Sequence, residues 1–435
     1  MADEKGVIVM RRRGTLLAAL GVFAAVALPA CAPSTNGGGD KKVHLTVLSW
    51  RPEDTTGYQK IFSAYEKSHP NVTVGFKGIK STEYLAVLPN EVKKAQGGPD
   101  VVQLKPYGPI QSLITGGNLV PLDGKVDVSG WPAETLQAAK GRQDGKLYGV
   151  PFALQTIQVL YNKKIFADQH INPPTTWDEM MAASDKLKKA GITPLATSGL
   201  QPWVLAIDHQ IFGATRYGAA AFSQAAVAGK KTFTDPDYLA SLQVVKQLAP
   251  YFPDKVTAVD YPDAQSLFTS GKAAMYPGGS YELAPFEKTA PDLDIGFFEA
   301  PPAPGSTIDH PVTSGWVDGS YGVNAKSPHQ AEALELVKWM ATKDFGQQFA
   351  NQLKQISAVP GTTPGDPLLA QMFKNYQAHG APYMMLVNFG YGNPLGRDAE
   401  GTALQKMLNG DASASDAGKE IQKGIHAWFK PSSGG

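Results

Sequence analysis

The sequence predicts an α/β fold with a largely parallel sheet. Over residues 43–104 the hydrophobic periodicity switches between two and 3.6 residues, in the order strand, helix, strand, helix, strand. The length of 435 residues favours two or three domains, and 43% hydrophobic with 18% charged residues leaves enough apolar surface for folded cores. Long disorder and a multispan membrane protein are therefore excluded.

The first three elements follow one another closely. Residues 43–50 alternate as a strand that ends at Trp50, and residues 58–65 place their apolar side chains on one helical face. Residues 72–76 alternate again as a second strand. Ligands of such sheets bind beyond the carboxyl ends of the strands, so Trp50 and Arg51 are expected at a binding rim.

The next helix and strand extend the same pattern. Residues 82–96 are expected to form a helix bent at Pro89, and the glycines at 97–98 break the chain before a strand at residues 100–104. The loop at residues 103–109 is then expected at the same rim.

Later segments contain further helical and strand patterns. Thr176 and Glu179 have the spacing of a capping box at the start of a helix. A helix that starts at a Ser-Pro cap is expected to bury Ala331, Leu334, Val337 and either Trp339 or Met340. The elements expected after the capping box are helices at 238–252 and 262–269, a strand at 273–276 and this helix at 327–342.

Residues 1–30 have the pattern of an export signal. The basic stretch 10–13 precedes an apolar run at 14–28, which is shorter than the ~20 residues that cross a bilayer core. The ending Leu28-Pro29-Ala30-Cys31 resembles the bacterial lipoprotein box, which implies that Cys31 is acylated and becomes the mature amino terminus.

Residues 31–42 are predicted to form a flexible tether behind Cys31. Nine small residues of this kind span about 15 to 18 Å. The protein is thus expected outside the cytoplasm, anchored to the outer face of the cell membrane, with a plain secretory leader as the alternative. The sequence leaves open whether Met1 or Met10 is the start and whether export is Sec or twin-arginine.

A formal charge of +1 offers no field that attracts nucleic acid, so no nucleic-acid partner is expected.

Four motifs carry a resemblance to a known family. They are Gly98-Pro99-Asp100-Val101-Val102; Leu147-Tyr148-Gly149-Val150-Pro151-Phe152 continuing to Leu160-Tyr161-Asn162-Lys163; Phe268-Thr269-Ser270-Gly271-Lys272-Ala273-Ala274-Met275 with Gly278-Gly279-Ser280-Tyr281; and Gly322-Val323-Asn324-Ala325-Lys326-Ser327-Pro328. In this order they resemble the family 1 extracellular solute-binding proteins, the maltose-binding-protein-like receptors of ABC importers. The resemblance covers residues 44–430.

This resemblance implies a two-lobed periplasmic-binding-protein-like fold of class II type, in which hinge strands cross between the lobes. We map lobe 1 to residues 44–152 plus 314–355 and lobe 2 to residues 156–310 plus 360–430. The implied protein is a monomeric, non-catalytic receptor that clamps a solute by hinge closure and presents it to a membrane permease.

Motifs of common enzymes are absent from the sequence. The eight His residues include no pair three or four apart, and no nucleophile elbow, Walker loop or dinucleotide-binding glycine motif occurs. The sequence therefore predicts no metal and no cofactor. Carboxylates that meet only in the fold stay open, with Glu282 and Glu299 as possible acids. A secreted glycoside hydrolase or lyase is thus the alternative function.

The predicted solute is a carbohydrate, specifically a di- or oligosaccharide. A sugar offers C–H faces to aromatic rings and hydroxyls to carboxylates, amides and arginine. Trp177, Trp339 and Trp428 lie in helical patterns and are expected in the core. A polyol, glycerol phosphate or peptide stays open as the solute, because similar folds bind them. The candidate binding residues, of which Gln155 and the stretch 279–281 rest on the resemblance, are Trp50, Arg51, Asp100, Lys105, Tyr107, Gln155, Trp203, Gly279, Ser280, Tyr281, Trp316, Asp318, Tyr391, Asn393 and Arg397.

Overall fold

The computed structural model describes residues 42–94 and 96–431, so the predicted signal, Cys31 and residues 32–41 of the tether lie outside the described residues. The strands are β1 (Val43–Ser49), β2 (Val72–Gly78), β3 (Val101–Leu104), β4 (Val150–Asn162), β5 (Thr193–Leu195), β6 (Ala273–Gly279), β7 (Ile295–Phe298), β8 (Thr313–Val323), β9 (Ile356–Ser357) and β10 (Gly380–Pro382).

In the described part of the chain these strands form one ten-stranded sheet with the order β2-β1-β3-β8-β4-β6-β5, and β7, β9 and β10 pair off this path. β1 runs parallel to β2 and β3, as the sequence predicts. The sheet as a whole is mixed, which corrects the prediction of a largely parallel sheet, because β8 runs antiparallel to both β3 and β4. β4 carries the chain away from the first three strands and β8 brings it back, so the two neighbours point in opposite directions.

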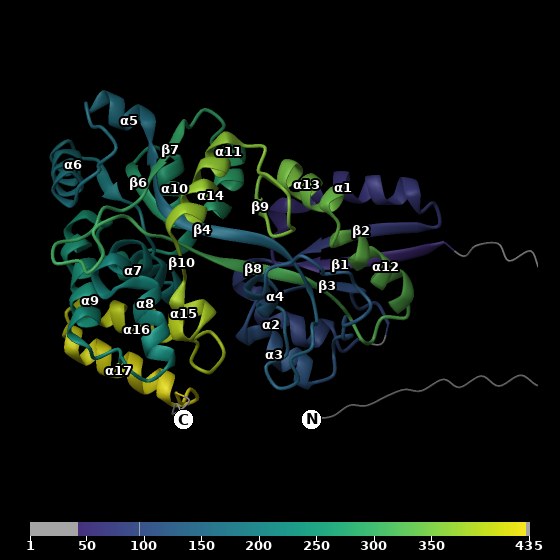
Figure 1. The fold of residues 1–435 in the computed structure, drawn as a ribbon. Coiled ribbons are helices and arrows are strands. Elements are labelled where there is room, and N and C mark those ends of the chain that lie inside the picture. Colours follow the sequence, from purple (N-terminus) through teal and green to yellow (C-terminus); the bar gives the residue numbers. More distant parts are fainter. Residues whose placement is uncertain (1–41, 95, 432–435) are drawn as a thin grey trace, which may run out of the picture. The chain divides into compact units, whose positions relative to one another are not determined.

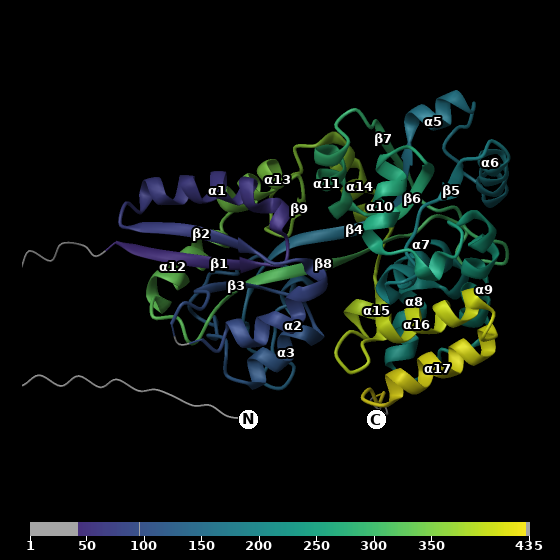
Figure 2. The same ribbon diagram turned by 180° about the vertical axis from the view of Figure 1, so that it is seen from behind.

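The helices lie in two groups on either side of these crossing strands (Figures 1 and 2). The helices are α1 (Thr55–Ser68), α2 (Ser81–Glu91), α3 (Gly108–Thr115), α4 (Ala133–Gln137), α5 (Lys163–Asp168), α6 (Trp177–Lys189), α7 (Pro202–Tyr217), α8 (Ala219–Val227), α9 (Pro236–Leu248), α10 (Tyr261–Thr269), α11 (Leu283–Thr289), α12 (Gln330–Met340), α13 (Lys343–Leu353), α14 (Pro367–His379), α15 (Met384–Val387), α16 (Gly396–Asn409) and α17 (Ala414–His426).

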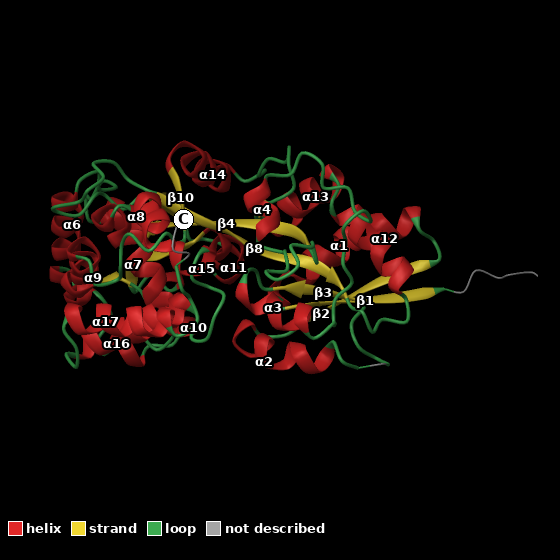
Figure 3. Ribbon diagram, turned by 60° about the horizontal axis from the view of Figure 1, so that its bottom comes forward, coloured by secondary structure: helices red, strands yellow, loops and turns green. Residues whose placement is uncertain are grey.

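Each group of helices encloses its own hydrophobic core. One cluster of buried side chains comes from β1–β3, α1–α3, α12 and α13, and we call these elements the first lobe. Two further clusters come from α5–α11, α14–α17 and β5–β7, which we call the second lobe. β4 and β8 run side by side between the two lobes (Figure 3), so a polar residue near their middle lies where the lobes meet.

Several predicted elements are confirmed, with shifts at their ends. Thr176 and Glu179 form the predicted capping box at the start of α6. α2 ends at Glu91 and not at residue 96, because Pro89 has no N–H to donate in the last turn and the glycines at 97–98 follow closely.

The prediction for the buried face of α12 is confirmed for Val337 and Met340 and wrong for Ala331. The helix starts at Gln330, and its buried side chains are Ala333, Leu336, Val337 and Met340; Ala331 is exposed and Leu334 is only partly buried. Both sets have helical spacing, so periodicity alone could not choose between them.

No helix in the described ranges combines the length and the apolar character that crossing a bilayer requires.

Candidate functional site

The carboxyl ends of β1 and β3 bring the first candidate residues together. Trp50 follows β1, and Lys105 follows β3, as the parallel pairing of these strands predicts. The Lys105 ammonium lies 4.0 Å from the centre of the Trp50 ring. Trp50 is only 2% exposed and packs on Tyr84 and Phe152, with ring centroids 5.7 and 5.6 Å away. Its ring therefore supports the Lys105 ammonium through a cation–π contact.

Arg51 is held by carboxylates on its own side of the site. Its Nε donates to Asp54 Oδ2 at 2.7 Å and lies 3.6 Å from Glu53 Oε1. Burial by itself lowers the pKa of Arg51, but Asp54 and Glu53, and more weakly Asp318, raise it above its ordinary value. Arg51 is 6% exposed, and its buried Nη2 has no hydrogen-bond partner in the part of the chain that the structure describes.

The crossing strands supply the centre of the candidate site. Gln155 on β4 is paired with Trp316 on β8, and the indole Nε1 of Trp316 donates to Asp318 Oδ1 at 3.2 Å. Gln155 Nε2 lies 3.3 Å from Gln355 Oε1 and 3.5 Å from Asp318 Oδ2. Ser280 Oγ in the second lobe donates to Gln155 Oε1 at 2.7 Å. Gln155 is fully buried, and its hydrogen bond with Ser280 joins the crossing strands to the second lobe.

Two tyrosines of the second lobe face Trp316. The ring centroid of Tyr281 is 6.2 Å and that of Tyr383 is 5.5 Å from that of Trp316. Gly279 is needed for packing, since a Cβ there would lie 2.0 Å from the Tyr281 ring. Burial raises the pKa of Tyr281 well above its ordinary value, and the nearby Asp318 carboxylate contributes to that shift.

Three cations and several carboxylates share this region. Burial, together with the positive charges of Arg397 and Arg51, lowers the pKa of Lys105 to about 8, while Asp318 and Glu53 oppose this shift. Arg397 Nε is buried without a hydrogen bond to any described residue and lies 3.6 Å from Asp398 Oδ1.

We call the site residues described so far in this section the cluster. A second contact between the lobes lies beside it. The Tyr107 and Tyr391 rings meet edge to face at 6.0 Å, and the Arg142 guanidinium lies 5.0 Å from the centre of the Tyr391 ring. A cavity of about 260 Å³ lies between α2, α3 and the loop at residues 391–395. Tyr107 adopts a positive φ of 64°, an unusual backbone conformation for a side chain of this size.

Three further candidate residues have the following surroundings. Asp100 lies at the opposite end of β3 from Lys105, where its carboxylate accepts from Thr46 N at 2.8 Å and Ser327 Oγ at 2.5 Å. Trp203 at the start of α7 contacts Tyr261 edge to face at 4.9 Å. The Asn393 side chain is exposed.

Sequence reasoning missed three residues that the fold adds to the cluster: Asp54, Gln355 and Tyr383. Asp54 Oδ2 accepts from both Arg51 and Gln355, the latter at 3.0 Å. The spacing of three residues between Arg51 and Asp54 was a usable signal, because such pairs often form salt bridges. Gln355 and Tyr383 lie far along the chain and have no local pattern that marks them.

The two possible catalytic acids are engaged in structural hydrogen bonds. Glu282 is buried and accepts from the Tyr261 and Tyr276 hydroxyls at 2.6 and 3.0 Å and from Gln265. Burial raises the pKa of Glu282 above its ordinary value. Glu299 accepts from Asn375 at 2.9 Å and is 2.5 Å from His379 Nε2. The two acids have separate sets of hydrogen-bond partners.

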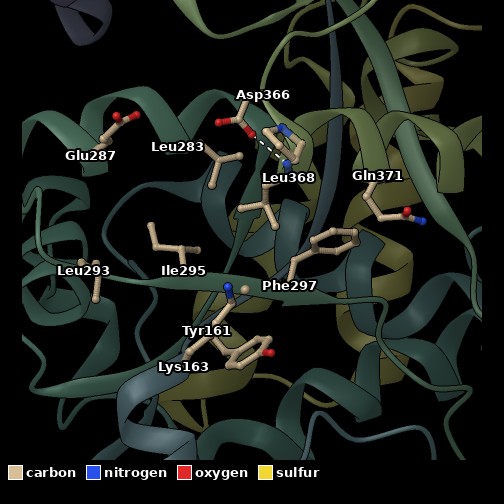
Figure 4. A pocket seen from close by; sticks show the side chains of 12 residues that line it. Tyr161, Lys163, Leu283, Glu287, Leu293, Ile295, Phe297, Asp366, Leu368 and Gln371 are labelled. Atoms are coloured by element: carbon tan, nitrogen blue, oxygen red, sulfur yellow. Dashed lines mark hydrogen bonds between the residues drawn. The ribbon is translucent and has the colours of Figure 1, made fainter.

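The larger cavity belongs to the second lobe alone. Its volume is about 530 Å³, and it lies between the end of β4, β7, α11 and the start of α14. Figure 4 shows Leu283, Ile295, Phe297 and Leu368 turned toward this space. Its lining includes none of the candidate binding residues.

Comparison with known proteins agrees on one family. The family model of the bacterial extracellular solute-binding proteins matches residues 50–347. The multiple sugar-binding protein of Streptococcus mutans is 26% identical over 332 residues, covering 74% of this chain and 77% of that relative.

Two solved structures have the same fold. A protein studied in work on xylan utilization by Caldanaerobius polysaccharolyticus is 21% identical, with a TM-score of 0.74, over 87% of this chain and 99% of that protein. The maltose-bound MalE3 of T. maritima is 18% identical, with a TM-score of 0.71, over 89% of this chain and all of that protein. These likenesses confirm the predicted α/β periplasmic-binding-protein fold.

Proposed function

Because the chain belongs to the bacterial extracellular solute-binding proteins, which are non-enzymatic receptors of ABC transporters, we propose that it captures a di- or oligosaccharide between its two lobes. The captured sugar is then delivered, chemically unchanged, to the permease in the membrane. The protein acts as a monomer, and its lobes are the segments 44–152 plus 314–355 and 156–310 plus 360–430.

One observation carries this proposal. Three buried donor groups, Arg51 Nη2, Arg397 Nε and the Tyr383 hydroxyl, have no hydrogen-bond partner among residues 42–94 and 96–431. Tyr383 contacts the Trp316 ring, and Arg51 and Arg397 lie near enough to Lys105 to lower its pKa. A buried donor without a partner costs about 1–3 kcal/mol, so these groups favour a ligand that brings oxygen acceptors. The hydroxyl and ring oxygens of a sugar meet this need beside aromatic rings.

The relatives support a sugar as the solute. The Streptococcus mutans relative is named for binding multiple sugars, and the T. maritima structure holds maltose. Tyr281, Trp316 and Tyr383 offer three rings, and Asp318 offers a carboxylate that a sugar hydroxyl can donate to.

Hinge closure follows from the same arrangement. Arg51 and Lys105 belong to the first lobe, whereas Tyr281, Tyr383 and Arg397 belong to the second, so one ligand can contact both. Such a ligand binds the closed form better than the open form and shifts the population toward it. The paired strands β4 and β8 are the connection about which the lobes turn.

A titration with sugars tests this function. The tryptophan fluorescence and melting temperature of the purified protein are measured against a panel of neutral and acidic mono- to tetrasaccharides. At least one sugar is expected to change both, with saturation, and mass spectrometry is expected to recover it intact. A cleaved sugar would overturn the receptor assignment, and no response to any sugar would overturn the choice of solute.

We also propose that Cys31 is acylated and holds the protein at the outer face of the cell membrane. The support is the lipoprotein-like sequence at residues 28–31, which precedes the described residues. Cys31→Ser is expected to move the protein from the membrane fraction to the medium or to leave it unprocessed. A processed variant that stays in the membrane fraction would contradict the anchor.

A further inference from the structure

The candidate site contains cationic donor groups without hydrogen bonds. Among the described residues, the buried Arg51 Nη2 and Arg397 Nε have no hydrogen-bond partner, although both side chains form ion pairs, Arg51 with Asp54 and Arg397 with Asp398. In the same part of the chain, no carboxylate forms an ion pair with Lys105, whose ammonium lies on the Trp50 ring. Two guanidinium nitrogens and one ammonium at this position can therefore still donate to a ligand.

The carboxylates of the site accept hydrogen bonds from other donors. Asp54 accepts from Arg51 Nε and from Gln355. Asp318 accepts from the Trp316 indole at 3.2 Å and faces Gln155 at 3.5 Å.

Glu53 lies 3.6 Å from Arg51 Nε, and burial raises its pKa. Asp398 lies 3.6 Å from Arg397 Nε, beyond hydrogen-bond distance. None of these acids satisfies Arg51 Nη2, Arg397 Nε or the Lys105 ammonium.

The cations also disfavour one another in the absence of a ligand. Burial lowers the pKa of Lys105; Arg397 and Arg51 add to this effect, and Asp318 and Glu53 oppose it, which together gives a pKa of about 8. A neutral sugar supplies oxygen acceptors but no charge, so it leaves that repulsion in place. An anionic group between the cations would relieve it and would accept from the guanidinium groups through charge-assisted hydrogen bonds.

We propose that the sugar bound between the lobes carries an acidic group, a carboxylate or a phosphate, which lies among Lys105, Arg397 and Arg51. The sugar ring then lies against Trp316 and the tyrosines at 281 and 383. This inference rests on the proposed function and narrows its solute to acidic sugars. Asp318 accepts from a sugar hydroxyl and keeps the acidic group on the side of the cations.

Matched sugars test the charge preference. The sets are glucose, glucuronate and glucose 6-phosphate; digalactose and digalacturonate; and trehalose and trehalose 6-phosphate, each titrated calorimetrically at pH 7. In at least one set the acidic member is expected to bind at least tenfold more tightly than its neutral counterpart. A uronate preference or a phosphate preference then identifies the acidic group.

Variants connect the preference to these side chains. Lys105→Met and Arg397→Met are expected to reduce the ratio of acidic to neutral affinity to about one. Lys186→Met, which removes an exposed lysine on α6, is expected to leave the ratio unchanged. Melting temperatures report whether each variant is folded.

Proton uptake gives a readout that needs no variant. At pH 8 an acidic sugar that contacts Lys105 raises its pKa, so binding takes up a fraction of a proton. Calorimetry in two buffers of different ionisation enthalpy measures this uptake, which is expected to be positive for acidic sugars and near zero for neutral ones. Equal affinity for neutral and acidic members, with no uptake, would overturn this inference and leave the sugar receptor standing. The absence of binding by any sugar would overturn the proposed function itself.

Discussion

Gly108 is a position where the backbone of the first lobe lies close to the backbone of the second. It is the first residue of α3, and a Cβ added there would lie 1.8 Å from the Gly390 carbonyl oxygen and 2.7 Å from Tyr391 Cα. Gly108 has no positive φ, so its backbone accepts alanine. Because the opposing atoms are backbone, no side-chain rotation can relieve the overlap. Gly108→Ala thus acts only on the contact between the lobes.

The size of the effect follows from this geometry. Ordinary contact begins at 3.4 Å and the Gly390 oxygen would lie at 1.8 Å, so the two loops must separate by about 1.6 Å to accept the methyl group. Overpacking of this kind costs about 1–3 kcal/mol. If the closed form alone contains the contact, the ligand must overcome this cost, and its affinity falls by about 5- to 150-fold. The stability of the ligand-free protein is expected to stay within about 1 kcal/mol, since alanine favours α3.

Calorimetric titration with the tightest sugar measures the loss, and small-angle scattering measures how far the protein compacts on binding. Gly75→Ala is the matched control, because a Cβ at this position in β2 meets only the movable His44 side chain at 3.1–3.2 Å at close range. The control is expected to bind like the wild type. An affinity of Gly108→Ala within twofold of the wild type, with the same compaction, would refute the reasoning.

The remaining predictions concern the site and the second lobe. Trp316→Ala is expected to weaken sugar binding by about tenfold or more, since it removes a stacking ring, whereas Trp177→Ala lowers the melting temperature without changing the affinity; equal affinity losses would disprove the site map. Lys105→Met is expected to raise the free energy of unfolding by about 1–3 kcal/mol at pH 7, because it removes an ammonium whose pKa is lowered to about 8. That gain should shrink as the pH rises from about 8 to about 10.4, because over this range Lys105 of the folded wild type has lost a proton that the unfolded chain still retains. A gain that urea denaturation finds to be constant with pH would argue against this prediction. His209→Ala is expected to lower the free energy of unfolding by about 2–4 kcal/mol, because the buried Glu400 and Ser241 lose hydrogen bonds of 2.8 and 2.7 Å; urea denaturation that shows a loss below 1 kcal/mol would contradict this value.

Local sequence patterns predict the site best where a strand ends. Trp50, Arg51 and Lys105 were predicted from the ends of parallel strands, and the fold places them side by side. The same reasoning did not distinguish the two ends of β3, so it also selected Asp100, which binds backbone and hydroxyl groups away from the cluster. The pattern predicts where a strand lies, but the partners of its side chains depend on neighbours from elsewhere in the chain.

The sequence by itself determined the α/β class, most of the elements and the ordered motifs of the family, because periodicity, capping and chain breaks act over a few neighbouring residues. Only the tertiary structure decided that the sheet is mixed, that Ala333 and Leu336 form the buried face of α12, and that Tyr383 and Gln355 join the candidate site. The antiparallel pairing of β4 and β8 brings residues more than 150 positions apart into contact, as between Gln155 and Trp316. Such contacts depend on how the lobes pack, and no local pattern in the chain records that.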